Sequence, residues 1–325
     1  MIASKSACLA AGAWALAAVA AIISPADAGA QEFPAKQITL VAPYGPGATL
    51  DTIARKMAEE MGKSLGQPVI VENRPGADGQ IGMDLVANRS QPDGYTIMIS
   101  SVPAMMLLPH TYKDLQFDPL NDFIPFIGIG EGRYLFGSAA NQPWKSIEEM
   151  VAYNKEGGRL LYGASNPAAR FWAVELVSAL GLEATSVPYK DSGVYIQALG
   201  SGEVSMGFLS EISALSLGDR FHVMATTGST RTASFPDAPT FSELELPQMG
   251  GDLYALSVPA GTPQEIVETL HDAASAALKL PAVKEAFANF RVELLDLGPQ
   301  EIGAEYRRQY EMFAGMAKAA GITPQ

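Results

Sequence analysis

Cysteine is almost absent from this sequence. The 325 residues contain one, Cys8, and it lies in an N-terminal segment that we predict to be removed. The mature chain would then have no cysteine, which excludes disulfide bonds, thiol catalysis and cysteine-bound metals even if export leads to an oxidising compartment. Its stability must therefore come from hydrophobic cores.

Positive charge is also scarce. The chain has 22 Lys and Arg against 35 Asp and Glu, a formal net charge of −13. Removing residues 1–30 takes away one Lys and one Asp, and the remaining 21 against 34 again give −13. Such a surface repels nucleic acid and anionic lipid. It also repels an anionic ligand at long range, so capture of a carboxylate must depend on short-range backbone amides and one or two local cations.

The usual signatures of catalysis are missing. The three histidines, His110, His222 and His271, do not lie at metal-ligand spacing from one another, and neither Gly-x-Ser-x-Gly nor His-Glu-x-x-His occurs. We therefore expect no enzyme, no catalytic residues, no metal and no cofactor. A catalytic triad assembled from distant residues is the alternative that the sequence leaves open.

The longest apolar run lies at the N-terminus. Lys5 precedes an alanine-rich stretch over residues 7–23, which is followed by Ser24, Pro25 and several small residues. This pattern is typical of a secretory signal peptide. Cleavage could follow Ala28 or Ala30, and we expect the second site. An uncleaved membrane anchor is the alternative, but the run is short and rich in alanine rather than leucine.

About 295 residues (325 minus 30) remain after cleavage, which is more than one hydrophobic core usually supports. The sequence therefore predicts two lobes. In both, short apolar segments alternate with segments of helical periodicity, which indicates an α/β fold.

The first strand-to-helix turn is the strongest candidate for a binding site. Residues 38–42 predict a buried strand, and apolar residues spaced three to four apart predict a helix from about residue 50. The backbone N–H groups of residues 47–50 then lie at the positive end of a helix dipole, where anions bind. Neither Gly-Lys-Ser/Thr nor Gly-x-Gly-x-x-Gly occurs here, so a small carboxylate is favoured over a nucleotide. The alternative is that the glycines only make the bend.

A second Gly-rich turn follows the next predicted strand. Residues 68–73 predict that strand, residues 74–79 the turn and residues 81–87 the start of a helix. A third strand over residues 95–100 ends at Ser100 and Ser101. Because ligands of parallel sheets bind beyond the carboxyl ends of the strands, both turns and both hydroxyls should face one crevice.

Seven motifs occur in a distinctive order along the mature chain. They are Val41-x-Pro43-Tyr44-x-Pro46-Gly47, Asp51-x-x-Ala54-Arg55, Leu65-Gly66-Gln67-Pro68-Val69-x-Val71-Glu72-Asn73-Arg74-Pro75-Gly76-Ala77, Pro92-Asp93-Gly94-Tyr95-Thr96, Asp118-Pro119-x-x-Asp122-Phe123-x-Pro125, Phe235-Pro236-Asp237-x-Pro239-Thr240 and Pro259-Ala260-Gly261-Thr262-Pro263. Together they resemble the Bug family, the periplasmic substrate-binding proteins of tripartite tricarboxylate transporters.

The resemblance implies the two-lobed type II periplasmic-binding-protein fold, a Venus flytrap with its ligand cleft between the lobes. By similarity, residues 1–30 are the signal peptide, residues 31–131 the first part of lobe 1, residues 132–253 lobe 2 and residues 254–325 the return segment of lobe 1. The glycines at positions 128–132 and 250–251 indicate flexible crossings at the same places.

The resemblance also implies a function. The protein would be a periplasmic monomer that captures a small carboxylate, aliphatic or aromatic and with one or two carboxyl groups, and delivers it to the membrane subunits of a transporter. A receptor that presents the ligand to a membrane signalling sensor is the alternative, because both roles need the same clamp.

The expected ligand-binding residues lie in the strand-end turns of both lobes or next to them. They are Tyr44, Gly45, Gly47, Ala48, Thr49, Asp51, Gly76, Ala77, Gly79, Ser100, Ser101, Ser165, Asn166, Ala169, Arg170, Tyr189 and Phe208.

Some of these positions have two interpretations. Asp51 could contact the ligand or simply favour the helix dipole. Ala48 replaces the family's second turn glycine and must adopt ordinary L-residue dihedrals. The family usually has a Gly-Ser pair around Ala168 and Ala169 and a His near Phe171 or Trp172; both are missing here, and Arg170 occurs instead. If it points into the cleft, it can bind a second carboxylate in bidentate fashion; the alternative is that it faces solvent, since a helix start disfavours a cation.

Overall fold

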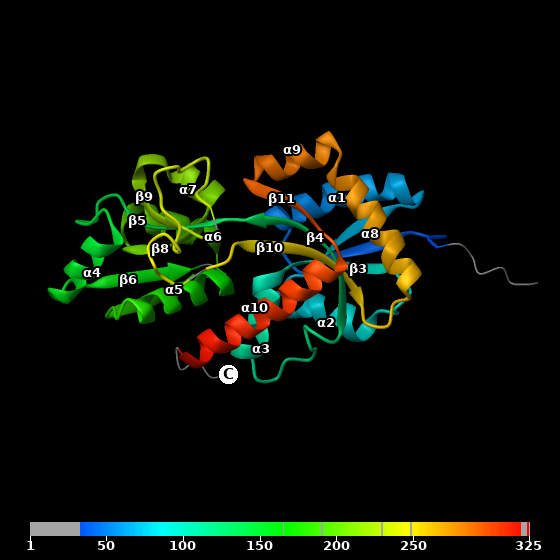
Figure 1. Cartoon of the computed structure of the whole chain (residues 1–325), viewed down its shortest axis with the longest axis horizontal. Helices are drawn as coiled ribbons and strands as arrows, with labels where there is room; N and C mark the ends of the chain where they lie inside the picture. The colour runs from blue at the N-terminus through cyan, green and yellow to red at the C-terminus, as the bar shows by residue number, and fades with distance from the viewer. Residues whose placement is uncertain are drawn as a thin grey trace, which may run out of the picture.

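The computed structural model describes residues 33–164, 166–189, 191–228, 230–247, 249–319 and residue 324. The predicted signal peptide and Ser165 lie outside these residues. Figure 1 shows two bodies side by side along the long axis of the molecule, each with a β-sheet covered by helices on both faces.

The first sheet has six strands within the described residues, in the order β11-β4-β10-β3-β1-β2. β1, β2 and β3 are mutually parallel, whereas β10 runs antiparallel to β3 and β4, and β11 runs antiparallel to β4. The strands are β1 (Ile38–Ala42), β2 (Val69–Asn73), β3 (Thr96–Ser101), β4 (Phe123–Gly132), β10 (Asp252–Pro259) and β11 (Val292–Leu297).

Helices cover both faces of this sheet. One hydrophobic core lies under α1 (Thr49–Leu65), α8 (Gln264–Leu278) and α9 (Pro281–Asn289). A second lies under α2 (Gln80–Arg89), α3 (Val102–Thr111) and α10 (Pro299–Ala319), and the short helix η1 (Ala77–Gly79) leads into α2. The sheet is therefore buried between two helical layers, as Figure 1 shows.

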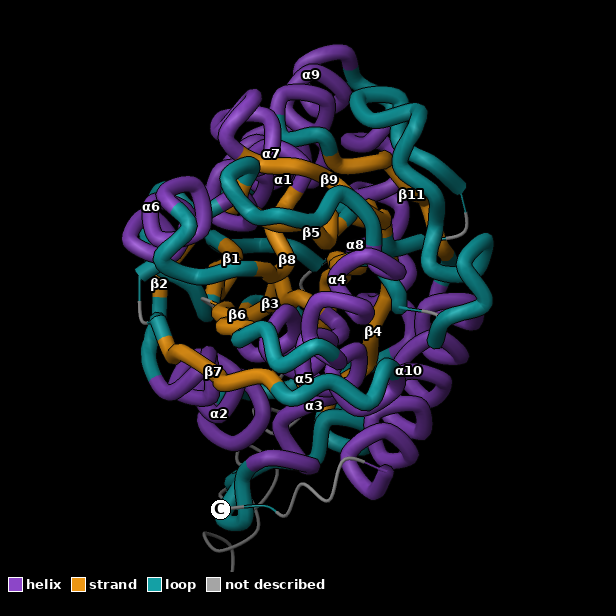
Figure 2. The backbone as a smooth tube through the Cα atoms, turned by 90° about the vertical axis from the view of Figure 1, so that its left-hand side faces the viewer, coloured by secondary structure: helices purple, strands orange, loops and turns teal. Residues whose placement is uncertain are grey.

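The second sheet has five strands in the described part of the chain, in the order β7-β6-β8-β5-β9. They are β5 (Tyr134–Ala139), β6 (Leu160–Ala164), β7 (Ala184–Pro188), β8 (Met206–Ser210) and β9 (Phe221–Thr226). On one face pack α4 (Ile147–Lys155) and α5 (Pro167–Ala179), and on the other α6 (Ser192–Ser201) and α7 (Glu211–Leu217), which is followed by the short helix η2 (Gly218–Arg220). In Figure 2 these helices surround the strands, with α6 and α7 on the side away from α10.

The chain crosses between the sheets twice. It leaves the first sheet between β4 and β5, and it returns between β9 and β10. The lobe boundaries at residues 131 and 253 stay a prediction, but both crossings lie next to the glycine-rich positions that the sequence indicated.

Helix α1 has the predicted amphipathic face. Ile53, Met57 and Met61 recur every four residues and are fully buried in the first core. The helix ends at Gly66, whose left-handed φ of 66° is the common glycine cap of a helix C-terminus. The local pattern thus fixes both the helix and the sheet face that it covers.

One aromatic contact joins the two lobes away from the strands. Phe171 of α5 packs edge-on against Phe313 of α10, with ring centroids 5.4 Å apart and planes at 83°. Phe171 belongs to the core cluster of α3 and α10, although its helix covers the second sheet. The lobes are therefore held together at the α10 side as well as by the crossing strands.

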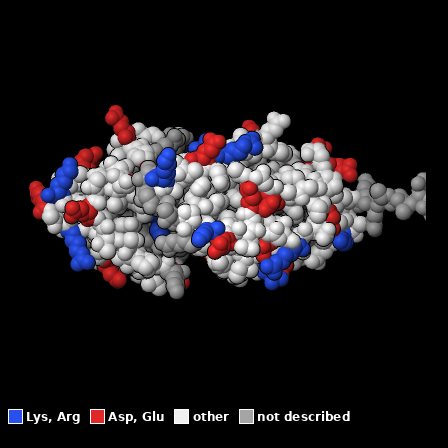
Figure 3. All heavy atoms as spheres, turned by 90° about the horizontal axis from the view of Figure 1, so that it is seen from below, with Lys and Arg blue, Asp and Glu red and all other residues white. Residues whose placement is uncertain are grey.

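The described helices are all too short or too polar to cross a membrane. Figure 3 shows Lys, Arg, Asp and Glu interspersed over the face seen from below, without a continuous basic patch on that face.

His110 on α3 is expected to make stability depend on pH. Its partly buried ring packs against Tyr310 of α10 with centroids 4.8 Å apart, and its Nε2 has no hydrogen-bond partner among the described residues. Burial lowers the His110 pKa, and a backbone hydrogen bond at Tyr310 only partly offsets this. The neutral ring therefore contributes stability above about pH 6.5, and this contribution is lost as pH falls below that value.

We expect His110→Gln to lose less stability than the wild type between about pH 7 and about pH 5, because glutamine does not titrate. Urea unfolding followed by circular dichroism at both pH values measures this. All other titratable groups are common to the two proteins, so equal losses would show that His110 does not titrate in this range.

Candidate ligand-binding cleft

A cavity of about 650 Å³ lies between the two lobes. Its residues on the first-lobe side are Pro43, Tyr44, Gly45, Gly47, Ala48, Thr49, Leu50, Pro75, Gly76, Asp78, Gly79, Ser101 and Ala104. Its second-lobe residues are Tyr134, Asn166, Ala168, Ser192, Tyr195, Ile196, Phe208, Leu209, Ser210, Ile212 and Ser213, with Asp252 and Tyr254 on the returning strand. The volume suits a small organic molecule.

The first turn presents the start of α1 to this cleft. Gly47 has a φ of 84°, which glycine adopts without strain, and Ala48 has φ −64° and ψ 157°, as predicted for an ordinary L-residue. Ala48 caps α1 but has no side-chain oxygen that could accept from the first helical amides. Thr49 and Leu50 both line the cleft, and their N–H groups have no side-chain cap.

Asp51 does not line the cleft. Its carboxylate turns back to accept from the Gly47 N–H at 2.9 Å and from Asn73 Nδ2 at 2.8 Å, and it pairs with Arg55 at 2.9 Å. Burial raises its pKa, but these hydrogen bonds together outweigh burial and hold the pKa below its usual value. Asp51 thus holds the turn in shape, which is the structural interpretation that the sequence left open.

The second turn adds Gly76 and Gly79, while Ala77 lies outside the cleft. Ala77 and Asp78 both have left-handed φ, 47° and 54°, which is unfavourable for residues other than glycine and recurs at binding sites. Tyr112 donates to the Asp78 carboxylate at 2.6 Å, and this hydrogen bond raises the pKa of Tyr112 to about 12. The strained turn is thereby held at the cleft rim.

A chain of hydrogen bonds crosses the floor of the cleft from one lobe to the other. The Ser101 N–H donates to the Tyr44 hydroxyl at 3.0 Å, and the Ser101 hydroxyl donates to Asp252. From the second lobe, the Tyr134 hydroxyl donates to Asp252 at 3.4 Å and Asn166 Nδ2 donates to Tyr134 at 3.2 Å. Ser101 and Asn166 also cap α3 and α5, so the chain joins helix starts in both lobes.

The electrostatics of the cleft come from backbone dipoles and two acids. None of the described lining residues is Lys or Arg, and the charged ones are Asp78 and Asp252. The N-terminal turns of α1, α3, α5 and α6 all contribute lining residues, so positive helix ends converge from both lobes. This arrangement can bind an anion through amides and hydroxyls.

Six of the predicted site residues in the described part of the chain do not line the cavity. Besides Asp51 and Ala77, Ser100 is fully buried beside Tyr306, because successive strand residues point to opposite faces of the sheet. Ala169 is buried and its N–H is used by the Asn166 cap at 2.8 Å. Ser165 lies outside the described residues.

Arg170 and Tyr189 also lie away from the cleft lining. Arg170 is exposed on α5, close enough to Tyr112 to lower that residue's pKa slightly against the Asp78 effect. Tyr189 packs behind Tyr195 with ring centroids 5.5 Å apart. The other predicted residues line the cavity: Tyr44, Gly45, Gly47, Ala48, Thr49, Gly76, Gly79, Ser101, Asn166 and Phe208.

Several lining residues were missed by sequence reasoning. Tyr134 and Asp252 directly follow the glycine-rich crossings, and Ser210 ends β8 as Ser101 ends β3. The strand-end rule applied to lobe 1 would have found Ser210. No comparable signal shows that the hinge side chains turn toward the ligand space.

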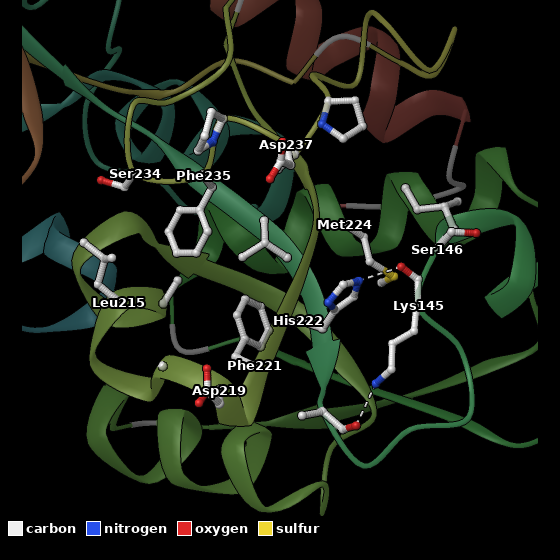
Figure 4. Close-up of a pocket in the computed structure, with 18 of the residues that line it drawn as sticks. Lys145, Ser146, Leu215, Asp219, Phe221, His222, Met224, Ser234, Phe235 and Asp237 are labelled. Carbon is white, nitrogen blue, oxygen red and sulfur yellow. Dashed lines mark hydrogen bonds between the residues drawn. The ribbon is translucent and has the colours of Figure 1, made fainter.

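A second cavity, of about 760 Å³, lies on the outer side of the second lobe (Figure 4). The rings of Phe221 and Phe235 face it, His222 Nε2 lies 2.7 Å from the Lys145 carbonyl oxygen, and the Lys145 ammonium donates to the Ala140 carbonyl at 2.8 Å. All its lining residues come from one lobe, so lobe closure cannot enclose a ligand there. In the described residues, no group of three or more His, Cys, Asp or Glu is placed to hold a metal ion.

Two α/β lobes joined by crossing strands, with a cleft between them, define the class of two-lobed solute-binding proteins. The family described as "Tripartite tricarboxylate transporter family receptor" matches residues 53–308, and the chain belongs to it. The predicted Bug-family resemblance and the predicted fold class are thereby confirmed.

Known relatives match over nearly their full lengths. A Cupriavidus necator protein, "UPF0065 protein in gbd 5'region", is 34% identical over 293 residues, 88% of each chain. The structure of periplasmic binding protein BugD has a TM-score of 0.77 and 27% identity and covers 90% of this chain and 100% of its own. Rpa4515 of R. palustris, solved with adipate, has a TM-score of 0.78, 28% identity and coverage of 90% and 100%.

Proposed function

We propose that this protein captures a small carboxylate in the interlobe cleft and delivers it to the membrane subunits of a tripartite tricarboxylate transporter. The family supports the transporter as partner. A carboxylate is supported by two structural relatives, Rpa4515 solved with adipate and MatC from Rhodopseudomonas palustris with bound malate, the latter with a TM-score of 0.76, 26% identity and coverage of 88% of this chain and 100% of its own.

The observation that carries the proposal is the start of α1. Its cap, Ala48, leaves the first helical amides without a side-chain partner, and the residues that carry them, Thr49 and Leu50, line the cleft together with Tyr44 and Ser101. One carboxylate group accepts hydrogen bonds from such amides and lies at the positive end of the helix dipole. The rest of the ligand then extends toward Tyr195, Phe208 and Ile212 of the second lobe.

Two other functions are weaker. A receptor that passes the ligand signal to a membrane sensor would use the same cleft, and only its partner would differ. An enzyme is disfavoured because the relatives are solute-binding receptors and the titratable side chains that line the cleft are two acids, four tyrosines and no histidine among the described residues.

A ligand panel tests the proposal. We expect at least one of adipate, malate, benzoate and acetate to bind with one-to-one stoichiometry and without chemical change. At a hundredfold excess over its dissociation constant, a ligand adds about 2.7 kcal/mol to stability, which thermal unfolding detects. If amines or sugars stabilise the protein and none of these carboxylates does, the amide site is misassigned. A chemically altered ligand, detected by mass spectrometry, would favour an enzyme.

Export is the second expectation to test. The charged start, the alanine-rich run and the small residues before Gln31 predict a mature periplasmic protein that begins at or near Gln31. The intact mass of the protein from a periplasmic extract measures the cleavage site. A mass that includes residues 1–30 would contradict the predicted signal peptide.

A further inference from the structure

Asp252 lies at the junction of the two lobes. It is the first residue of β10, where the chain re-enters the first sheet, and it pairs with Gly132 at the end of β4. Its side chain lines the ligand cleft and also a cavity of about 30 Å³ behind the cleft, which is space for about one water molecule. This carboxyl group therefore forms part of the floor beneath any bound ligand.

Neutral groups hold this carboxyl. The Ser101 hydroxyl donates to one oxygen and the Tyr134 hydroxyl, at 3.4 Å, to the other. The Tyr254 hydroxyl of the same strand also forms a hydrogen bond with this carboxyl. The Tyr44 hydroxyl is linked to it through Ser101, whose N–H donates to Tyr44. Hydroxyls can donate to a carboxylate or accept from a carboxylic acid, so this setting suits both protonation states.

The ionised groups around Asp252 do not neutralise it. Glu131 of the adjacent strand β4 adds a like charge. Arg133, Arg291 and Glu211 line the small cavity behind Asp252. The Arg133 guanidinium already donates to the Thr227 carbonyl, to Thr230 and to Glu293, and Arg291 is exposed to solvent. Burial raises the pKa of Asp252 to about 6, with Glu131 adding to the effect.

On the cleft side, the other charged lining residue is again an acid, Asp78 at the rim. A carboxylate ligand thus enters a site whose described lining offers no cation and whose floor is a carboxyl group. Two carboxylates that share a poorly solvated site do not both stay ionised, because the repulsion raises the pKa of one of them. The amides at the start of α1 favour the ionised ligand, which leaves Asp252 as the group that takes the proton.

We infer that Asp252 takes up a proton from solvent when a carboxylate binds, so that ligand and proton are captured together. The inference rests on the proposed function and specifies how the cleft accepts an anion without a lysine or arginine. Affinity should fall as pH rises through neutrality, by up to about tenfold per pH unit, until the pH exceeds the Asp252 pKa of the complex.

Proton uptake is measured by isothermal titration calorimetry in two buffers of different ionisation enthalpy at about pH 7. The probe is the best binder among adipate, malate, benzoate and acetate, all of which are ionised at this pH. The wild type should take up a substantial fraction of one proton per ligand. Asp252→Asn should bind with no uptake and with an affinity that stays constant across the same pH range.

Glu131→Gln is the matched control. Glu131 is the neighbouring acid whose pKa is also raised by burial, but it lies outside the cleft and accepts the Gly251 N–H at 3.0 Å, which glutamine can still accept. This variant should keep the proton uptake. Uptake that persists in Asp252→Asn, or that is lost only in Glu131→Gln, overturns the assignment.

A measurement on the wild type covers the case in which Asp252→Asn does not fold. Infrared difference spectra on ligand binding should show a new protonated carboxyl band, and its absence would overturn the inference. Binding without proton uptake refutes only the role of Asp252. If none of the four carboxylates binds, the proposed function fails and the inference fails with it.

Discussion

Thr49→Pro is expected to weaken carboxylate binding by about thirtyfold, or about 2 kcal/mol, without unfolding the protein. Thr49 is the first residue of α1, where proline is favoured and where the N–H has no partner within the helix. The extended backbone of Ala48, with ψ 157°, is also compatible with a following proline. The substitution therefore removes one N–H donor from a residue that lines the cleft and leaves the helix intact. Calorimetric titration gives the affinity, and thermal unfolding gives the stability.

Gln264→Pro is the matched control. Gln264 is the exposed first residue of α8, it also follows a residue with extended backbone (ψ 140°), and α8 lies away from the cleft lining. This variant should bind as the wild type does. If Thr49→Pro also binds normally while both variants stay folded, the start of α1 does not hold the ligand, and the second turn at Gly76 and Gly79 becomes the candidate.

Trp172→Ala is expected to destabilise the second lobe by about 3 to 5 kcal/mol. Trp172 on α5 is fully buried, and its ring lies edge-on to Tyr134 at 4.9 Å and tilted against Phe208 at 6.1 Å. Truncation leaves a cavity directly behind two residues that line the cleft. Urea unfolding measures the loss. It is followed by circular dichroism, because the substitution removes a tryptophan and would change the fluorescence signal.

Trp172→Phe separates packing from polarity. The indole N–H of Trp172 is buried without a hydrogen-bond partner among the described residues, which itself costs stability. Phenylalanine removes this unpaired donor and keeps most of the apolar ring, so the two effects oppose each other and the net change should stay within about 1 kcal/mol. A loss as large as that of Trp172→Ala would mean that the full indole volume is required.

The elements of lobe 1 that form the cleft follow closely from local sequence. The strand at residues 38–42, the turn after it and the periodicity of α1 appear where the pattern predicts them, because each depends on neighbours in the chain. The same holds for the second turn and for Ser101 at the end of β3. Backbone donors at strand ends can therefore be found without knowing any long-range contact.

Arg170 shows why side chains were harder to place. Both interpretations of Arg170 place it at the start of a helix, but α5 begins three residues earlier, at Pro167, with Asn166 as its cap. The first turn of α5 that reaches the cleft therefore carries Ala168, and Arg170 lies further along the helix, at about 1.5 Å of rise per residue. Arg170 is exposed, while its neighbours Phe171 and Trp172 are buried. One error in the helix start therefore changes which side chain could reach the ligand.

Asp252 and Tyr134 illustrate a second limit. Their positions beside the crossings could be anticipated from the glycines, but their direction depends on how β10 pairs with β4 and how β5 pairs with β8. The pairing of β10 with β4 joins residues more than a hundred positions apart. The pairing of β5 with β8 depends on where the second lobe begins. Local patterns carry no information on them.

The contact between Phe171 and Phe313 restricts how the clamp can move. Because α5 packs on α10 through this contact and two strands connect the lobes, the second lobe can rotate about the α10 side as a hinge. Moving the lobes straight apart would break the aromatic contact. Displacement then grows with distance from α10 and is greatest at α6 and α7, which lie on the opposite side in Figures 1 and 2. The angle between the lobes would then set the distance from α1 to Ile196 and Ile212 across the cleft, and with it the length of ligand that fits.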